Sequence, residues 1–254
     1  MPEKHSAATI VSMAVVAMGL AVLLHEGLGH GVTAWLRGDI PTELSSNHLS
    51  SMRADKWVDA GGTLVNLAVG ILAWFAARAA GNHANLRYFL WLVAAKNLFP
   101  GAGYFMFSGI SGFGDWQQVI EGWPHQLAWR IGMTAFGAVL YFLVAWLLAI
   151  GVRPFVAQRG EYNIVGRLPY VAGCLFSCAA GALDPLGWKL FLMSTVPAAF
   201  GGSSGMLWLD SLMPRQQPEA ALRVRREPVW WVVAVIFGLA YIFIVGPGIK
   251  LGPS

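Results

Sequence analysis

Three titratable residues, His25, Glu26 and His30, lie within six positions at the end of an apolar stretch. Imidazole and carboxylate groups suit Zn²⁺, which in catalytic sites takes three protein ligands and keeps a fourth position for water. The metal lowers the pKa of that water to about 7, so that a nearby glutamate can act as general base. A carboxylate at the centre of a membrane helix costs about 2.5 to 3.5 kcal/mol, and a divalent cation would compensate this cost. The cluster therefore indicates a hydrolytic metal site.

The spacing of the two histidines constrains the helix that carries them. His25 and His30 are five residues apart, which separates them by about 140° around a regular α-helix, whereas a spacing of four gives about 40°. In a regular helix Glu26 and His30 would share a face, Glu26 would be a ligand, and the general base would be missing. A π-bulge or an unwound turn at Gly27 to Gly29 would bring the histidines together and free Glu26. We predict such a distortion, with imidazole nitrogens about 3 to 4 Å apart.

The composition places these residues in a membrane. The 254 residues are 56% hydrophobic and 12% charged, whereas an average soluble domain is about 25% charged. Lys and Arg are scattered singly between the apolar stretches, a pattern typical of membrane loops, so the partner indicated by the net charge of +4 is the lipid bilayer and not a nucleic acid. Two cysteines, Cys174 and Cys178, make neither a disulfide framework nor a zinc ribbon.

The apolar stretches predict an all-α fold with about six or seven transmembrane helices. The expected spans are residues 8–36, 58–79, 86–107, 127–151, 170–183, 186–209 and 229–245. The segment 39–59 is too polar to lie in lipid, and the short turn at 81–83 predicts an antiparallel helix hairpin. Pro100 predicts a break in the third span, with a cavity beside it. We expect one membrane-embedded domain, 1–254, with a catalytic core of three spans at 8–116 and additional spans at 127–247.

Two further sequence motifs follow the histidines along the chain. Residues 60–67 read Ala-Gly-Gly-Thr-Leu-Val-Asn-Leu, and residues 97–100 read Asn-Leu-Phe-Pro before a glycine-rich segment that ends in Gly-Asp-Trp at 114–116. In this order the sequence resembles the site-2 protease family of intramembrane zinc metalloproteases, which has His-Glu-x-x-His, then Ala-Gly-Pro-x-x-Asn, then Asn-x-x-Pro followed by Leu-Asp-Gly. The likeness covers residues 24–116. It departs from the family in the histidine spacing, in Thr63, and in a longer insert before Asp115.

The resemblance implies a role for each matched residue. The zinc ligands would be His25, His30 and Asp115, and Glu26 would be the catalytic base. Two amide side chains would orient the substrate or the oxyanion: Asn66 and Asn97. The implied activity is cleavage of peptide bonds in membrane-embedded protein substrates. Because the histidines bring no charge to neutralise a cation, we also predict that Asp115 faces the first helix.

Other interpretations stay open at this point. The same buried residues would serve a non-catalytic metal-binding protein or a transporter, in which metal flux would survive Glu26→Gln. An inactive pseudoprotease would keep the fold to bind membrane helices and would contain no metal. Gly61 and Gly62 are equally typical of close packing between membrane helices, and Asp115 is equally typical of a solvated loop.

Overall fold

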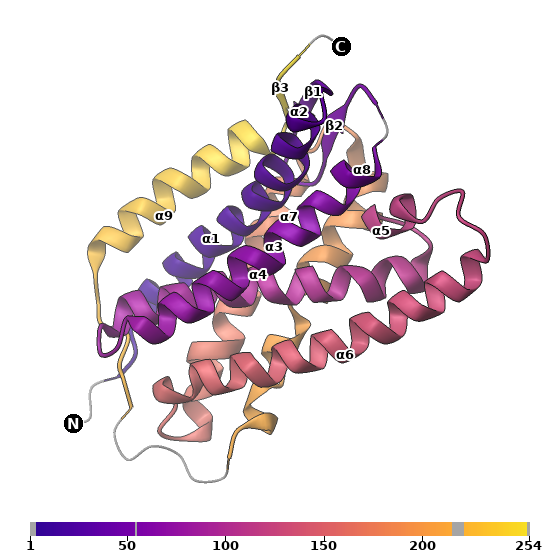
Figure 1. Cartoon of the computed structure of the whole chain (residues 1–254). Coiled ribbons are helices and arrows are strands. Elements are labelled where there is room, and N and C mark those ends of the chain that lie inside the picture. Colours follow the sequence, from indigo (N-terminus) through magenta and orange to yellow (C-terminus); the bar gives the residue numbers. More distant parts are fainter. Residues whose placement is uncertain (1–3, 54, 215–220, 253–254) are drawn as a thin grey trace.

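The computed structural model describes residues 4–53, 55–214 and 221–252, most of them in helices (Figure 1). Within this part of the chain five helical stretches are long and apolar enough to cross a membrane: Ala7–Leu36, Lys56–Ala79, Gln126–Phe155, Arg159–Gly181 and Pro228–Val245. The chain is therefore an all-α membrane protein, as the sequence predicted.

The first stretch is one continuous helix whose central segment is π-helical. It comprises α1 (Ala7–Leu23), the π-helical segment η1 (Leu24–Val32) and α2 (Thr33–Leu36). Ser6 caps its start by accepting a hydrogen bond from the Thr9 N–H. Its end agrees with the prediction, since Gly38 adopts a left-handed φ of 71°, which stops the helix. α1 packs against α4, α7 and α9 and so lies at the centre of the bundle.

A small sheet follows α2, where the sequence predicted only a polar segment. β1 (Pro41–Leu44) pairs antiparallel with β2 (Leu49–Ser51), and β3 (Ile249–Lys250) pairs antiparallel with the other edge of β1. The strand order is therefore β2-β1-β3. The sheet lies near the carboxyl end of the first helix, close to the C-terminus of the chain (Figure 1).

The next two helices form the expected hairpin. α3 (Lys56–Ala79) and α4 (Ala84–Ser111) pack along each other, and α4 also packs along α6. Pro100 does not break α4, so the predicted break is wrong. The flanking helices support the backbone around the proline, a situation in which a membrane helix tolerates it. α4 is long enough to span a membrane but is not among the five stretches, because its polar residues lower its hydropathy.

The second half of the chain differs from the prediction in one place. α6 (Gln126–Val152) runs on into η2 (Arg153–Phe155), and the next stretch joins η3 (Arg159–Glu161), η4 (Asn163–Arg167) and α7 (Leu168–Gly181). The expected span at 186–209 is instead a series of short helices: α8 (Gly187–Leu190), η5 (Phe191–Thr195), η6 (Pro197–Gly202), η7 (Ser204–Leu207) and η8 (Leu209–Leu212). Pro197 and the Gly201-Gly202 pair interrupt its regular hydrogen bonding. The last stretch is α9 (Pro228–Ala240) with η9 (Tyr241–Val245).

Close packing between α3 and α4 depends on a glycine. A Cβ atom added at Gly70 would lie 2.5 Å from Leu98 Cγ and 3.0 Å from the Leu98 backbone nitrogen. At Gly132 on α6, an added Cβ would meet nothing within 4 Å. The two glycines therefore differ in the space around them, although both lie within long helices.

We expect Gly70→Val to destabilise the protein by about 1 to 3 kcal/mol, because the added side chain forces α3 and α4 apart. The measurement is the thermal unfolding of the purified protein in detergent. Gly132→Val, which adds the same side chain to open space, is the matched control. Equal unfolding temperatures for the two variants would contradict the packing described here.

Candidate metal centre

The π-helical segment η1 brings the two histidines together. His25 and His30 lie on the same side of this segment, with their Nε2 atoms 3.2 Å apart and their rings nearly perpendicular, at 82°. A π-helix places residues five apart above one another, because its hydrogen bonds join residues i and i+5. Both the predicted distortion and the predicted separation of the imidazole nitrogens are confirmed.

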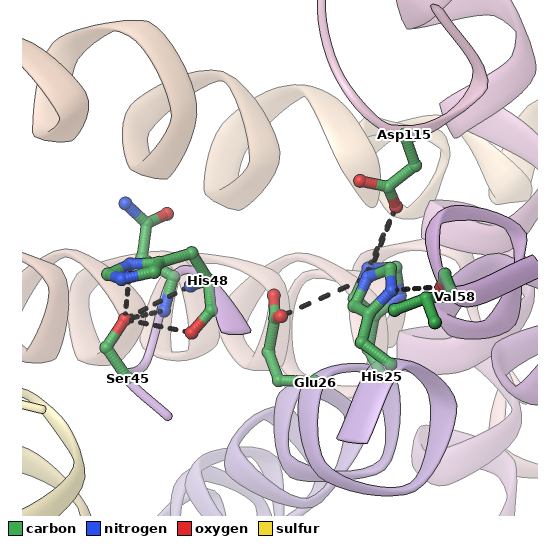
Figure 2. A network of polar contacts seen from close by, with 8 residues as sticks. His25, Glu26, Ser45, His48, Val58 and Asp115 are labelled. Atoms are coloured by element: carbon green, nitrogen blue, oxygen red, sulfur yellow. Dashed lines mark hydrogen bonds and ion pairs between the residues drawn. The ribbon is translucent and has the colours of Figure 1, made fainter. Parts of the chain in front are cut away.

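Asp115 closes a triangle with these two nitrogens. Its Oδ2 lies 3.3 Å from His25 Nε2 and 3.4 Å from His30 Nε2. Figure 2 shows the Asp115 carboxylate pointing toward the imidazoles from the side that lies away from η1. Gly114, with a left-handed φ of 91°, turns the chain into the short helix α5 (Asp115–Val119). Tetrahedral zinc with bonds of about 2.0 to 2.1 Å holds its ligands about 3.3 Å apart. The predicted approach of Asp115 to the first helix is confirmed.

Glu26 stands beside the triangle. Its Oε2 is 4.0 Å from His30 Nε2, farther than the spacing within the triangle. His25, Glu26 and His30 could also hold a metal ion, since they offer ligand atoms within 4.8 Å of one another. That set is looser than the one that Asp115 completes. The distances would suit zinc best with Asp115 as third ligand, and Glu26 would then be a buried carboxylate next to the metal position.

Contacts around the triangle orient its members. His30 Nδ1 lies 2.6 Å from the carbonyl oxygen of Val58, which can only accept a hydrogen bond, so Nδ1 carries the hydrogen. Such a contact fixes the orientation of a ligating imidazole and directs Nε2 at the metal. Asp115 Oδ2 is buried and makes no hydrogen bond to the described residues, which suits an atom that faces a cation.

The charge state of Asp115 also suits a ligand. Burial acts to raise the pKa of this carboxyl group, but the neighbouring imidazoles of His30 and His25 hold its pKa well below the ordinary value. The carboxylate is therefore ionised at neutral pH, as metal binding requires.

Glycines on α3 form the floor of the site. A Cβ atom on Gly62 would lie 2.5 Å from His30 Nε2 and 2.6 Å from His25 Nε2, so the imidazoles rest directly on this glycine. Gly61 and Gly29 make an equally close contact, in which an added Cβ on either residue would collide with the backbone of the opposite helix. The glycine pair is therefore close packing and part of the site at once.

Two cavities meet at Glu26. The wide cavity, of about 360 Å³, reaches His30 and Asp115 and is lined by polar and apolar residues from 47–53 and from 113–118. The narrow cavity, of about 70 Å³, is lined by His25, Glu26 and Asn66 and continues along α4. The narrow cavity is lined by Pro100 and so lies where the sequence suggested a cavity, although α4 itself is unbroken.

The two asparagines singled out by sequence differ in their surroundings. Asn66 lines the narrow cavity, and its Oδ1 is buried without a partner among the described residues. Asn97 is fully buried, its Nδ2 donates to the carbonyl oxygen of Val93 one turn earlier, and it does not line either of the two cavities. Of the two, Asn66 is positioned to meet a substrate.

Sequence reasoning assigned no site role to several residues that lie here. The ring of Tyr104 lies 5.3 Å from that of His25, and Asn47 lines both cavities. Tyr104 is four residues after Pro100 and eight after Lys96, and this shared helix face was a signal that could have identified it. Asn47 lies in a hairpin that has no signature beyond polar composition.

A hydrogen-bonded cluster holds this hairpin in place. Ser45 Oγ lies 2.8 Å from His48 Nδ1 (Figure 2). Ser45 Oγ also donates to Asp184 Oδ2 at 2.7 Å, and His48 Nε2 lies 3.3 Å from Glu43 Oε1. His48 thus offers one ring nitrogen to each side of the cluster. Burial acts to lower the pKa of His48, but hydrogen bonding and charge attraction to Asp184 raise it above the ordinary value. Burial acts to raise the pKa of Asp184, whereas His48 and Ser45 lower it.

Comparisons of the chain with protein-family models, with curated proteins and with solved structures give no match. The class of the protein therefore depends on its helices and on the geometry of this centre.

If the centre binds Zn²⁺, we expect Gly62→Ala to lower the zinc content of protein purified in the presence of Zn²⁺, because a methyl group at this position displaces both imidazoles by contact. Metal content per chain, measured on the purified protein, checks this. Gly27→Ala is the matched control, since a Cβ there meets nothing within 4 Å. Full zinc content in the Gly62 variant would show that the imidazoles do not bind the metal where they lie.

His48→Gln should destabilise the protein by about 1 kcal/mol near pH 6 and by less near pH 9. A raised folded-state pKa means that the contribution of His48 is complete below its ordinary pKa of about 6.5 and is lost as pH rises through the higher value. The check is the difference in unfolding temperature from wild type at the two pH values. The exposed His83 provides the control, His83→Gln. A difference that grows with pH would refute the pairing of His48 with Asp184.

Proposed function

We propose that the chain is a multi-pass intramembrane zinc metalloprotease that cleaves peptide bonds of membrane-embedded protein substrates. The observation that carries the proposal is the near-equilateral triangle of His25 Nε2, His30 Nε2 and Asp115 Oδ2, with a free carboxylate beside it. The triangle matches the spacing of tetrahedral zinc ligands. The resemblance of the motif order to that of site-2 proteases, which assigns the same residues as ligands and base, is a second ground for the proposal.

The residues around the triangle have distinct roles in this reaction. Zinc, when bound, supplies a Lewis acid that acidifies a water molecule and polarises the scissile carbonyl. Glu26 accepts a proton from the attacking water and later donates it to the leaving amine. A C–O bond forms and the C–N bond breaks, so the products are a carboxylic acid and an amine. Asn66 donates its amide hydrogens to the substrate or to the developing oxyanion.

Hydrolysis at this depth needs a path for water. The wide cavity would provide it, because it connects Glu26, His30 and Asp115 with the polar hairpin and with the segment before α5. The hydrogen bonds among Ser45, His48 and Asp184 would hold the hairpin that lines this path next to the metal site. The narrow cavity, which continues from Glu26 along α4, would receive the peptide.

The decisive measurement compares zinc content and peptide cleavage in the full-length protein purified in detergent. Wild type should bind about one zinc per chain, and His25→Ala, His30→Ala and Asp115→Ala should each lose it, because three ligands are the minimum of a catalytic site. Glu26→Gln should keep the zinc and lower cleavage of a model transmembrane peptide by about 10² to 10⁴-fold.

Three outcomes would overturn the proposal. Full zinc occupancy in Asp115→Ala would show that Asp115 is not the third ligand. Cleavage that survives Glu26→Gln would show that Glu26 is not the general base. Zinc flux across vesicles that survives Glu26→Gln, in a protein without peptidase activity, would favour a metal transporter instead.

A further inference from the structure

Lys96 lies inside the bundle at the end of the narrow cavity away from the metal centre. Its side chain is 1% exposed, its ammonium group donates to Ser203 Oγ at 3.2 Å, and it lies 5.6 Å from the centre of the Tyr170 ring. No carboxylate of the described residues lies within 4.0 Å of it. An ammonium group has three hydrogens to donate, and the Ser203 hydroxyl accepts one of them. Neither this hydroxyl nor the Tyr170 ring carries a negative charge that would balance the ammonium group.

The helix α4 gives the distance from this lysine to the metal centre. Lys96, Pro100 and Tyr104 are four residues apart, and all three line the narrow cavity. The ring of Tyr104 lies against that of His25. Eight residues of helix rise about 12 Å, so the Cα atom of Lys96 lies about 12 Å along the axis of α4 from that of Tyr104, which is level with the metal centre.

The first helix gives the same distance independently. A Cβ atom on Gly173 would lie 2.9 Å from Lys96 Nζ and 3.7 Å from Met18 Cβ. The ammonium group is therefore level with Met18, which lies eight residues before Glu26, again about 12 Å along the helix. Two helices thus place the ammonium group at the same depth.

The rest of the cavity lining places no acidic residue at this end. Of its hydroxyl groups, that of Ser177 comes one turn of α7 after Gly173, which faces Lys96, whereas Ser194 also lines the wide cavity and Thr195 contacts Gly181, both toward the metal end. Glu26 is the one acidic residue of the lining, and it lies at the metal end. One end of the cavity therefore carries the proposed base, and the other end carries an unpaired cation.

We propose that Lys96 binds a carboxylate of the substrate about three to four residues from the bond that is cleaved. This proposal rests on the proposed peptidase function and names its substrate class. An extended peptide covers about 3.3 Å per residue, so three to four residues span the 12 Å between Glu26 and Lys96. The carboxylate belongs either to the C-terminus of the peptide or to an aspartate or glutamate side chain.

The experiment measures binding, without turnover, to full-length Glu26→Gln protein loaded with zinc. The probes are N-acetyl-tetraleucine with a free carboxylate, the same peptide as its C-terminal amide, and an amide in which glutamate replaces the last leucine. We expect at least one acidic peptide to bind about tenfold tighter than the neutral amide. Preference for the free acid identifies the C-terminal carboxylate as the ligand, and preference for the glutamate peptide identifies a side chain.

Substitution of the lysine completes the test. Lys96→Met should abolish the preference and leave the affinity for the neutral amide unchanged, whereas Lys96→Arg should retain a preference. The exposed Lys189 provides the matched control, Lys189→Met, which should behave like the parent protein. Zinc content and unfolding temperature verify that each variant is folded.

Two results would overturn the proposal: the absence of any preference for an acidic peptide in protein that retains Lys96, or a preference that persists in a folded Lys96→Met protein. The first result does not depend on whether the Lys96 variant folds. A failure of the peptidase function is separate, since it appears as lost cleavage in wild type while the binding preference remains.

Discussion

The whole centre depends on how closely η1 approaches α3. Gly29 on one helix and Gly61 on the other meet through their backbones, and Gly62 then lies directly beneath both imidazoles. At this distance no side chain fits between the helices, so both imidazoles pack directly against the backbone of α3 at Gly62. Val58, one turn before Gly62 on α3, fixes the rotation of the His30 ring from the same helix. One helix contact thus determines both the position and the direction of the two imidazole nitrogens that could bind a metal.

Much of this arrangement was predictable because it follows from local geometry. The five-residue spacing of His25 and His30 is incompatible with one face of a regular helix. This incompatibility, together with Gly27 and Gly29 and the frequent occurrence of π-bulges at functional sites, predicted the π-helical segment. The approach of Asp115 followed from charge, since two neutral imidazoles cannot balance a divalent ion. The all-α membrane fold followed from composition, because long apolar stretches with few charges have no alternative in lipid.

The features that escaped prediction depend on contacts between distant parts of the chain. Nothing near Ser45 or His48 indicates that Asp184 will meet them, so the ordered hairpin could not be anticipated. Pro100 suggested a break that α3 and α6 prevent by packing on both sides of α4. The stretch 186–209 is apolar enough for a span, but its proline and glycines divide it into short helices, of which η5 and η6 contribute to the lining of the narrow cavity.

The pairing of β3 with β1 affects the order in which the protein is assembled. Glu43 pairs with Lys250 and Leu44 with Ile249, so the third strand of the sheet is synthesised only after all five candidate spans. Closing a loop of this length carries an entropic cost that has to be met before the pair contributes anything. On the ribosome, therefore, the two histidines and Asp115 exist long before the sheet beside them is complete. During synthesis the sheet therefore consists of β1 and β2 alone until the last candidate span has been made, and only then does β3 join the free edge of β1.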